Sequence, residues 1–353
     1  MNNPFIYLRA LKHAEQTVFC VQDGQKTYYD PQFNKAMAFS SGQQVKRSIL
    51  QTLCDELNVP MAPITFNFNV TKKKELENKE PWSPCDPTYI DQLLGGWMRA
   101  GDGPTKKRRS PLSISAMRPI HPLLGGISKE NITFDRSDRP NQHPVNVRMA
   151  DSDKLMTEEE IEQFLQDNDR TLSRRTWIPD QARTTGLFVY DVAIDLRTLF
   201  CVTTQQFEPE VSTEMIEKLK NAGWTLSKNV FGECLVMPKE QREKIIPALA
   251  EALIEWRVTS NQARTFSLME TLAIAISDNA NTLAGAIRAK LIDDGDKPKA
   301  KPIVDENAGA DTFITLACAN YIVTESESAS AINNAKKKLI DVMMAFDYEN
   351  QCE

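Results

Sequence analysis

The sequence predicts an α+β fold, and three neighbouring stretches near the N-terminus carry that prediction. Residues 4–11 and 17–22 are apolar and β-rich, residues 41–58 repeat an apolar side chain every four positions, and residues 64–70 alternate strictly between apolar and polar. Strand, helix and strand in this order, with a polar face on the last strand, are typical of a ferredoxin-like or RRM-like sheet layer. We therefore expect an RRM-like sheet as the centre of the fold.

The helix at 41–58 begins with a polar turn. Ser41 is the expected N-cap and Gln44, three residues later, its capping-box partner. The apolar stripe that should face the sheet comprises Val45, Ile49, Leu53 and Leu57. The opposite face carries Gln43, Arg47 and Gln51, with Lys46 on its flank. Amide and cationic side chains beside the free N–H groups of a helix start indicate a surface for an anion or a polar polymer.

The next stretch, from residue 71 to about 180, is irregular and rich in Pro, Gly and Asn. Its aromatic and Leu-Leu-Gly-Gly segments favour order, so we interpret it as an elaborate insertion in the first domain with a short acidic helix at 157–168.

Regular patterns return after the insertion. We predict strands at 184–203, 263–277 and 312–324, helices at 212–224, 238–256 and 327–347, and a polar surface loop at 292–311.

The composition indicates a soluble cytoplasmic protein. The 353 residues are 41% hydrophobic and 25% charged, and we find neither a membrane-length apolar run nor a secretory signal. Seven cysteines are scattered without a C-x-x-C pair, which indicates buried thiols rather than disulfides or a zinc site.

Charge is distributed unevenly along the chain. The net charge is −6, but the segment from Trp97 to Arg148 holds ten Lys or Arg against four Asp or Glu, which is +6 and leaves −12 for the rest. Within it, Lys106, Lys107, Arg108 and Arg109 form a basic run that we expect in an exposed loop. A basic segment on an acidic body fits a polyanion that contacts only part of the surface, although a merely solvated loop would have the same composition.

A second polar turn, "RVTSNQARTFS" at 257–267, follows a predicted helix and presents Asn261, Gln262 and Arg264. Together with the helix start and the basic run it offers amide and guanidinium donors without a nucleophile, which favours binding a nucleic-acid backbone.

No enzymatic signature is present in the sequence. The three histidines are isolated, and we find no Walker A loop, G-x-G-x-x-G motif or G-x-S-x-G elbow. The acidic stretch "IDDGD" at 292–296 is better interpreted as a solvated turn than as a metal site. We therefore expect no catalytic residues, no metal and no cofactor.

These residues resemble a known family. "SSGQQVKRSIL", a long insertion with "KRRSPLSISAMRPIHP", then "GLFVYDVAIDL" and "NQARTFSLME" are similar, in this order, to the DevR-type CRISPR-associated backbone subunit, the "Cas-seven" family of type I Cascade complexes. The resemblance spans about residues 4 to 277, and the helix start and the SPL-x-x-S-A block are its most specific parts.

The resemblance implies a modified RRM-like palm (1–60 and 181–353), a fingers insertion (61–180) and a thumb within about 197–237. Copies of the family's subunit stack as a helical filament along CRISPR guide RNA, beside other Cascade subunits, and support pairing of the guide with a target DNA strand in antiviral defence. The RNA-binding positions it implies here are Gln43, Gln44, Lys46, Arg47, Lys106, Lys107, Arg108, Arg109, Asn261, Gln262 and Arg264.

Two alternatives stay open at this point. A type III-like relative would cleave target RNA with a metal and an early aspartate, for which Asp23 in "VQDGQ" is the candidate, although Asp-Gly is also a hairpin-turn signal. A DevR-like regulatory protein would act without guide RNA.

Overall fold

The computed structural model describes residues 3–19, 25–100, 103–137, 142–150, 154–258 and 266–352. The chain divides into two compact units, Met1–Ile127 with Thr184–Glu353, and Ser128–Arg183. Residues 61–127 therefore belong with the sheet-bearing unit, whereas the sequence placed them in one insertion with 128–180.

Strands and helices are interspersed along the chain. The strands are β1 (Phe5–Thr17), β2 (Thr27–Asp30), β3 (Lys35–Ala38), β4 (Thr65–Val70), β5 (Leu76–Trp82), β6 (Trp97–Arg99), β7 (Lys106–Arg108), β8 (Leu112–Ile114), β9 (Arg118–Pro119), β10 (Gly125–Asp135), β11 (Arg175–Asp195), β12 (Cys201–Thr203), β13 (Thr225–Asn229), β14 (Gly232–Val236), β15 (Thr271–Ser277), β16 (Ile287–Asp293), β17 (Lys299–Val304) and β18 (Asp311–Ile314). The helices are α1 (Gly42–Glu56), α2 (Ile90–Gly95), α3 (Glu158–Asp167), α4 (Leu196–Leu199), α5 (Thr213–Asn221), α6 (Lys239–Glu255), α7 (Ala280–Ala286) and α8 (Ala331–Ala345), with short 3-10 turns at Pro122–Leu124 and Leu316–Asn320.

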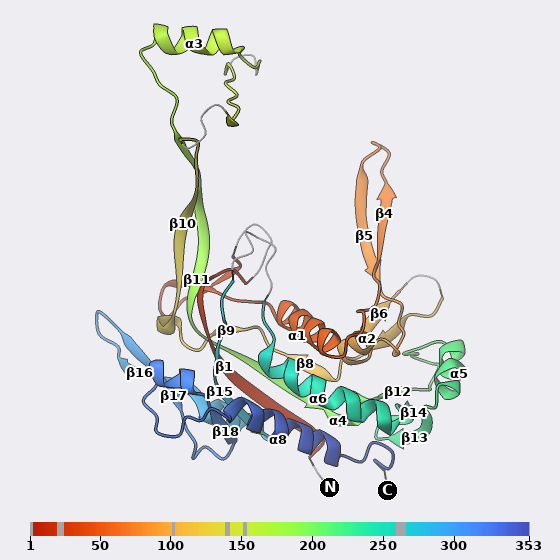
Figure 1. Ribbon diagram of the computed structural model, residues 1–353. Coiled ribbons are helices and arrows are strands. Elements are labelled where there is room, and N and C mark those ends of the chain that lie inside the picture. The colour runs from red at the N-terminus through yellow and green to blue at the C-terminus, as the bar shows by residue number, and fades with distance from the viewer. Residues whose placement is uncertain are drawn as a thin grey trace. The chain divides into compact units, whose positions relative to one another are not determined.

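The first unit is built on an antiparallel sheet (Figure 1). β1 pairs with β11 on one side and with β15 on the other, β8 and β9 extend the sheet beyond β11, and β18 extends it beyond β15. With α1 between β1 and β8, and α6 between β11 and β15, this is the strand order of a ferredoxin-like or RRM-like fold. The predicted α+β class is confirmed.

β1 extends further than the first predicted strand, 4–11, and continues through residues 12–16. Of the second predicted strand, 17–22, only Thr17 belongs to β1, residues 18–19 are not in a strand, and residues 20–22 lie outside the described residues. The pairing of β1 with β11 is regular from Phe5 to Ala14 and then shifts register before Thr17, where Gln16 has a positive φ of 46°. The polar residues near position 15 thus form a β-bulge against β11.

One face of the sheet packs against three helices. Ile6, Leu8 and Ala10 of β1 are buried with the α1 stripe and with apolar residues of α6 and α8. α1 contacts α6, and α6 contacts α8 along the sheet (Figure 1). The predicted helix at 41–58 is confirmed, since its apolar residues Val45, Ile49 and Leu53 are fully buried here.

The other face of the sheet is covered at one end by α7, with Leu11 of β1 and Leu272 of β15 in its core.

The expected loop at 292–311 is in large part a hairpin of β16 and β17. Predicted strand 184–203 comprises the end of β11, α4 and β12, and predicted strand 312–324 ends at Ile314 before a 3-10 turn.

Strand 64–70 does not join the central sheet. It forms β4 of a two-stranded hairpin with β5, and its apolar residues Phe66, Phe68 and Val70 are 71%, 54% and 71% exposed. The alternation does mark a strand, but the second strand of the RRM-like order is the β8–β9 segment.

The range predicted to hold a thumb, about 197–237, contains a separate three-stranded sheet of order β12-β14-β13 and the helix α5. This subdomain belongs to the first compact unit.

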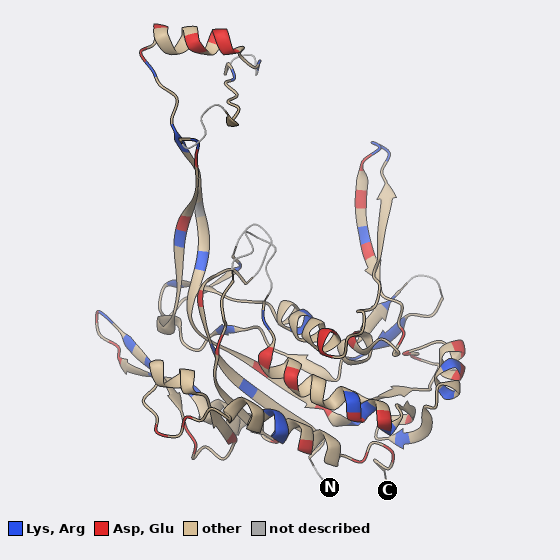
Figure 2. Ribbon diagram, in the orientation of Figure 1, with Lys and Arg blue, Asp and Glu red and all other residues tan. Residues whose placement is uncertain are grey.

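In the second unit, β10 and β11 pair along their outer parts and the chain between them includes α3. α3 confirms the predicted acidic helix: Thr157 and Glu160 form a capping box, and the first turn carries three glutamates (Figure 2). Ile161 is its buried apolar residue, while Phe134 and Trp177 are more than half exposed.

A buried lysine links three elements of the first unit. Lys12 of β1 is fully buried, and its Nζ donates to Ile254 O at the end of α6 (3.1 Å) and to Thr271 Oγ1 of β15 (2.9 Å). Burial, with the nearby Arg257 as the next contribution, lowers the pKa of Lys12 to about 7.

This pKa predicts a pH-dependent stability. In the unfolded chain Lys12 titrates near pH ~10.4, so between about pH 7 and 10 the unfolded state binds one more proton. The free energy of unfolding should therefore rise with pH in this window by roughly 1 kcal/mol per pH unit from this group. Urea denaturation of the wild type and Lys12→Met at several pH values measures the contribution, and identical pH slopes would contradict a buried, neutral Lys12.

Candidate nucleic-acid interface

The start of α1 has the predicted N-cap, which is one half of the predicted capping box. Ser41 is the N-cap residue in extended conformation, and its Oγ accepts a hydrogen bond from the N–H of Gln44 at 3.3 Å. The cap fixes the direction of the first turn, and so of the side chains at positions 43, 44, 46 and 47.

The two most specific segments of the family resemblance lie against each other here. The residue before the cap, Ser40, exchanges two backbone hydrogen bonds with Met117, at 2.9 and 3.0 Å. A Cβ on Gly42 would stand 2.7 Å from Ile114 O, so only glycine lets the helix approach the β8 segment this closely. "SSGQQVKR" and "SPLSISAM" therefore form one local structure.

The exposed face of α1 is as predicted. Gln43, Arg47 and Gln51 are exposed, and Gln44 is half-buried. Gln51 donates to Asp55 Oδ1 at 2.8 Å, one turn later on the same face. This leaves Gln43 and Arg47 as the exposed pair nearest to the helix start.

Lys46 has an internal role. Its Nζ donates to Gly95 O, the last residue of α2, at 2.8 Å, and burial lowers its pKa to about 8. The neighbouring carbonyls of α2 accept from Arg108 Nε (to Leu93 O, 2.9 Å) and from Ser110 Oγ (to Leu94 O, 2.7 Å). Three side chains thus satisfy the carbonyl end of α2, where cationic donors are favourable.

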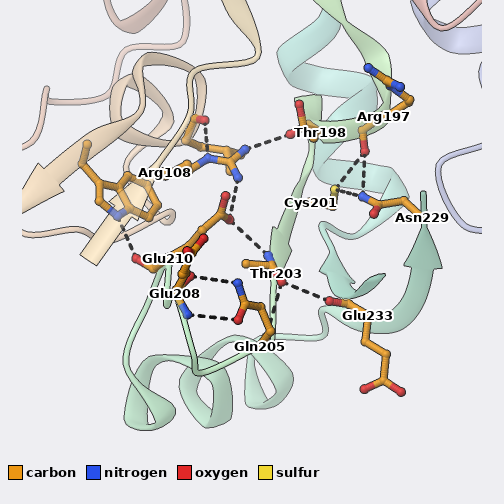
Figure 3. A network of polar contacts seen from close by, with 12 residues as sticks. Arg108, Arg197, Thr198, Cys201, Thr203, Gln205, Glu208, Glu210, Asn229 and Glu233 are labelled. Carbon is orange, nitrogen blue, oxygen red and sulfur yellow. Dashed lines mark hydrogen bonds and ion pairs between the residues drawn. The ribbon is translucent and has the colours of Figure 1, made fainter. Parts of the chain in front are cut away.

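Arg108 is buried, with its side chain 1% exposed, and its remaining donors are also paired (Figure 3). Nη1 donates to Glu210 Oε2 at 3.0 Å and Nη2 to Thr198 O at 2.8 Å, while the guanidinium lies 5.7 Å from the Trp97 ring. The prediction that Arg108 meets nucleic acid is wrong, because each guanidinium nitrogen already donates inside the protein. Lys46 is half-buried and has one hydrogen bond, to Gly95 O, so its assignment to nucleic-acid binding stays a prediction.

The basic run is a strand rather than a loop. β7 pairs with β6, and the Lys107 N–H donates to Pro209 O at 3.1 Å. Because side chains alternate along a strand, Arg108 points into the protein while Lys107 and Arg109 are exposed, and Lys106 is half-buried.

Lys107 and Arg109 line a cavity of about 920 Å³. Its wall also includes Arg197 of α4, Phe207, which is 99% exposed, and Phe231, which is 59% exposed. Sequence reasoning missed these three residues. A signal was present in the aromatic residues of two turns, "QQFEP" and "NVFGE", where apolar side chains are not needed for a core.

Four sequence-predicted residues cannot be placed. Asn261, Gln262 and Arg264 of the predicted polar loop, and Asp23 of the alternative nuclease site, lie outside the described residues. Their assignments stay predictions.

The described residues offer no metal cluster. Among the residues that the structure describes, no group of three or more His, Cys, Asp or Glu side chains could hold a metal ion. Asp293 of the "IDDGD" stretch accepts from the Gly295 N–H at 3.0 Å, as in an ordinary turn. Five of the cysteines are buried free thiols and Cys352 is an exposed one.

In the described part of the chain, the helices are too short or too polar to cross a bilayer.

Comparison with known proteins finds similarity to solved structures. No family model matches the chain, and no curated protein matches it. One solved structure, "CRISPR RNA-guided surveillance complex, pre-nicking", is 11% identical, covers 96% of this chain and 89% of its own, and has a TM-score of 0.45. Another, "CRISPR RNA-guided surveillance complex", is also 11% identical, covers 96% and 84%, and has a TM-score of 0.38.

The different environments of two adjacent arginines predict different effects on stability. Arg108→Met leaves the Glu210 carboxylate without its cation and two carbonyls without donors, so the free energy of unfolding should fall by about 3–5 kcal/mol. Arg109→Gln, at an exposed position, should change it by no more than about 0.5 kcal/mol. Chemical denaturation of both variants measures the difference, and equal losses would contradict the inward orientation of Arg108.

Proposed function

We propose that this chain is a guide-RNA-binding structural subunit of a type I CRISPR surveillance complex in antiviral defence. In this role several copies stack as a helical filament along the guide RNA, contact other Cascade subunits and support pairing of the guide with a target DNA strand. The observation that carries the proposal is the exposed pair Gln43 and Arg47, on a capped helix whose start packs directly against the "SPLSISAM" segment.

The chemistry of this pair supports binding to a nucleic-acid backbone. An amide and a guanidinium four residues apart lie on one helix face, so both can contact one stretch of phosphates. The nearby helix start adds the favourable end of the helix dipole, and the buried stripe of Val45 and Ile49 holds the helix in place while the exposed face is occupied.

We further propose that the subunit is not an enzyme. The donors named above suit phosphate and ribose oxygens, and none of them is a nucleophile or a general base. A type III-like nuclease that uses Asp23 remains the alternative, and Asp23→Ala in a target-RNA cleavage assay separates the two. A regulator that acts without RNA would purify without bound guide RNA.

The first functional prediction concerns Arg47. Arg47→Glu removes one phosphate contact and adds a repulsive charge, yet leaves the Ser41 cap and the apolar stripe intact. Affinity for guide RNA should fall at least about tenfold, and the slope of log K against log salt should become shallower by about 0.7 to 1. Fluorescence anisotropy at several salt concentrations measures both quantities.

Lys244→Glu provides the matched control, since Lys244 is an exposed helical cation on α6 outside the resembling segments. It makes the same change in net charge and should leave affinity and salt slope near those of the wild type. If both variants lost the same affinity for guide RNA, that affinity would depend on the net charge of the protein and not on this helix face. An unchanged affinity in Arg47→Glu would reject this surface.

The second functional prediction concerns sequence tolerance. Phosphate and ribose oxygens are the same at every nucleotide, so scrambling the spacer of the guide should change affinity by no more than about a few-fold. Competition binding with several spacers of one length tests this, and a strong preference for one spacer would show that base edges are contacted.

A further inference from the structure

One end of the sheet face opposite α1 is left partly open. There Phe5 and Tyr7 of β1 are half-buried, whereas Ile6 and Leu8 on the other face are buried under the helices. The cavity beside Lys107 and a second hollow of about 420 Å³ share Ser113 and Ala193 in their walls. The two hollows are therefore neighbours along this end of the sheet.

A column of stacked planar groups stands at this place. The Arg197 guanidinium lies 4.9 Å from the centre of the Phe5 ring and 4.9 Å from the centre of the Phe231 ring. The Tyr7 ring is stacked with the Phe5 ring, its centre 6.0 Å away and its plane tilted by 17°. Successive contacts therefore link Phe231, Arg197, Phe5 and Tyr7, which come from a turn, a helix and a strand, and we call this set the column.

Hydrogen bonds hold the column in position before any ligand arrives. Arg197 donates to both carboxylate oxygens of Asp195, at 2.8 and 2.9 Å, and this pairing raises the pKa of the guanidinium. Asn229 Nδ2 donates to Arg197 O at 3.2 Å (Figure 3), and Asn229 Oδ1 accepts from the Phe231 N–H at 2.8 Å. The turn that carries Phe231 is thus tied to the residue on which Phe231 stacks.

Folding alone does not account for the outer end of this column. Phe231 is 59% exposed and Phe207, in the same cavity wall, is 99% exposed, so neither ring gains much from burial within the chain. Their cavity also contains the exposed cations Lys107 and Arg109. Open aromatic faces beside cations are the combination by which proteins bind single-stranded nucleic acid.

We propose that this cavity is a second contact site, which binds a single-stranded nucleic-acid segment by stacking a base on Phe231, as an extension of the column, with its phosphates at Lys107 and Arg109. The proposal rests on the nucleic-acid-binding function proposed above, but it concerns bases at a different surface from Gln43 and Arg47. Guide RNA and a displaced DNA strand offer the same chemistry, so both are tested.

The experiment compares oligonucleotides with and without bases. The wild type is titrated with a 12-nucleotide single-stranded RNA, the DNA of the same sequence, and a DNA in which the central positions are abasic. The number of phosphates is then constant, and only stacking differs between the base-bearing and the abasic DNA. The wild type should bind the base-bearing strand roughly 5- to 150-fold more tightly, the range measured for base–aromatic stacking.

Phe231→Ala should abolish most of this difference while leaving affinity for the abasic strand unchanged. Phe66→Ala is the matched control, because Phe66 is a 71% exposed phenylalanine on the β4–β5 hairpin, outside the cavity. A double Lys107→Gln and Arg109→Gln variant should weaken both strands equally and make the salt slope shallower by roughly two phosphates. The preferred strand, RNA or DNA, identifies the source of the ligand.

The possible failures are distinguishable. If Phe231→Ala keeps the full preference for bases while Arg47→Glu loses affinity, the column is not a binding site and the proposed function stands. If the wild type binds none of the strands, the proposed function itself fails. If Phe231→Ala changes the oligomeric state in the absence of nucleic acid, the cavity is a contact between protein chains, which also overturns the proposal.

Discussion

The carbonyl end of α2 is the constraint on which the rest of this surface depends. A helix end that is buried needs donors for its last carbonyls, and here Arg108, Ser110 and Lys46 supply them. Gly96 makes the approach possible, since at its φ of 74° a Cβ would stand 2.7 Å from Arg108 O. One short helix thus joins α1 to the β6–β7 hairpin and, through Arg108 and Glu210, to the β12–β14 subdomain.

This arrangement divides the cations of the chain into two groups. Those that meet the helix end donate hydrogen bonds to its carbonyls, and Arg108 is also paired with the Glu210 carboxylate. The cations one strand position away, Lys107 and Arg109, remain exposed and can meet a polyanion. Replacing Arg108 is expected to destabilise the fold, whereas Lys107 and Arg109 are proposed to act in binding, although all three belong to one basic run.

The same subdomain positions an aromatic surface. Asp195 fixes Arg197, Arg197 contacts two phenylalanine rings, and Asn229 connects this residue to the turn bearing Phe231. A guanidinium held in this way is preorganised, so little conformational entropy is lost when a further planar group is added to the stack. The proposed phosphate contacts and the proposed stacking surface therefore use different parts of one unit, and their contributions to affinity should depend differently on salt.

The sequence by itself determined the features that rest on local interactions. The cap at Ser41, the stripe of α1 and the acidic helix α3 were predicted correctly, because a 3.6-residue period and a capping pair are complete within one segment. Tertiary structure alone decided which strand β1 pairs with, why Phe66 and Phe68 lie exposed on a hairpin, and that Arg108 points inward between two exposed cations. The pairing of β1 and the orientation of Arg108 depend on partners more than eighty residues away, β11 for β1 and Glu210 for Arg108, and no pattern within a short segment contains such a partner.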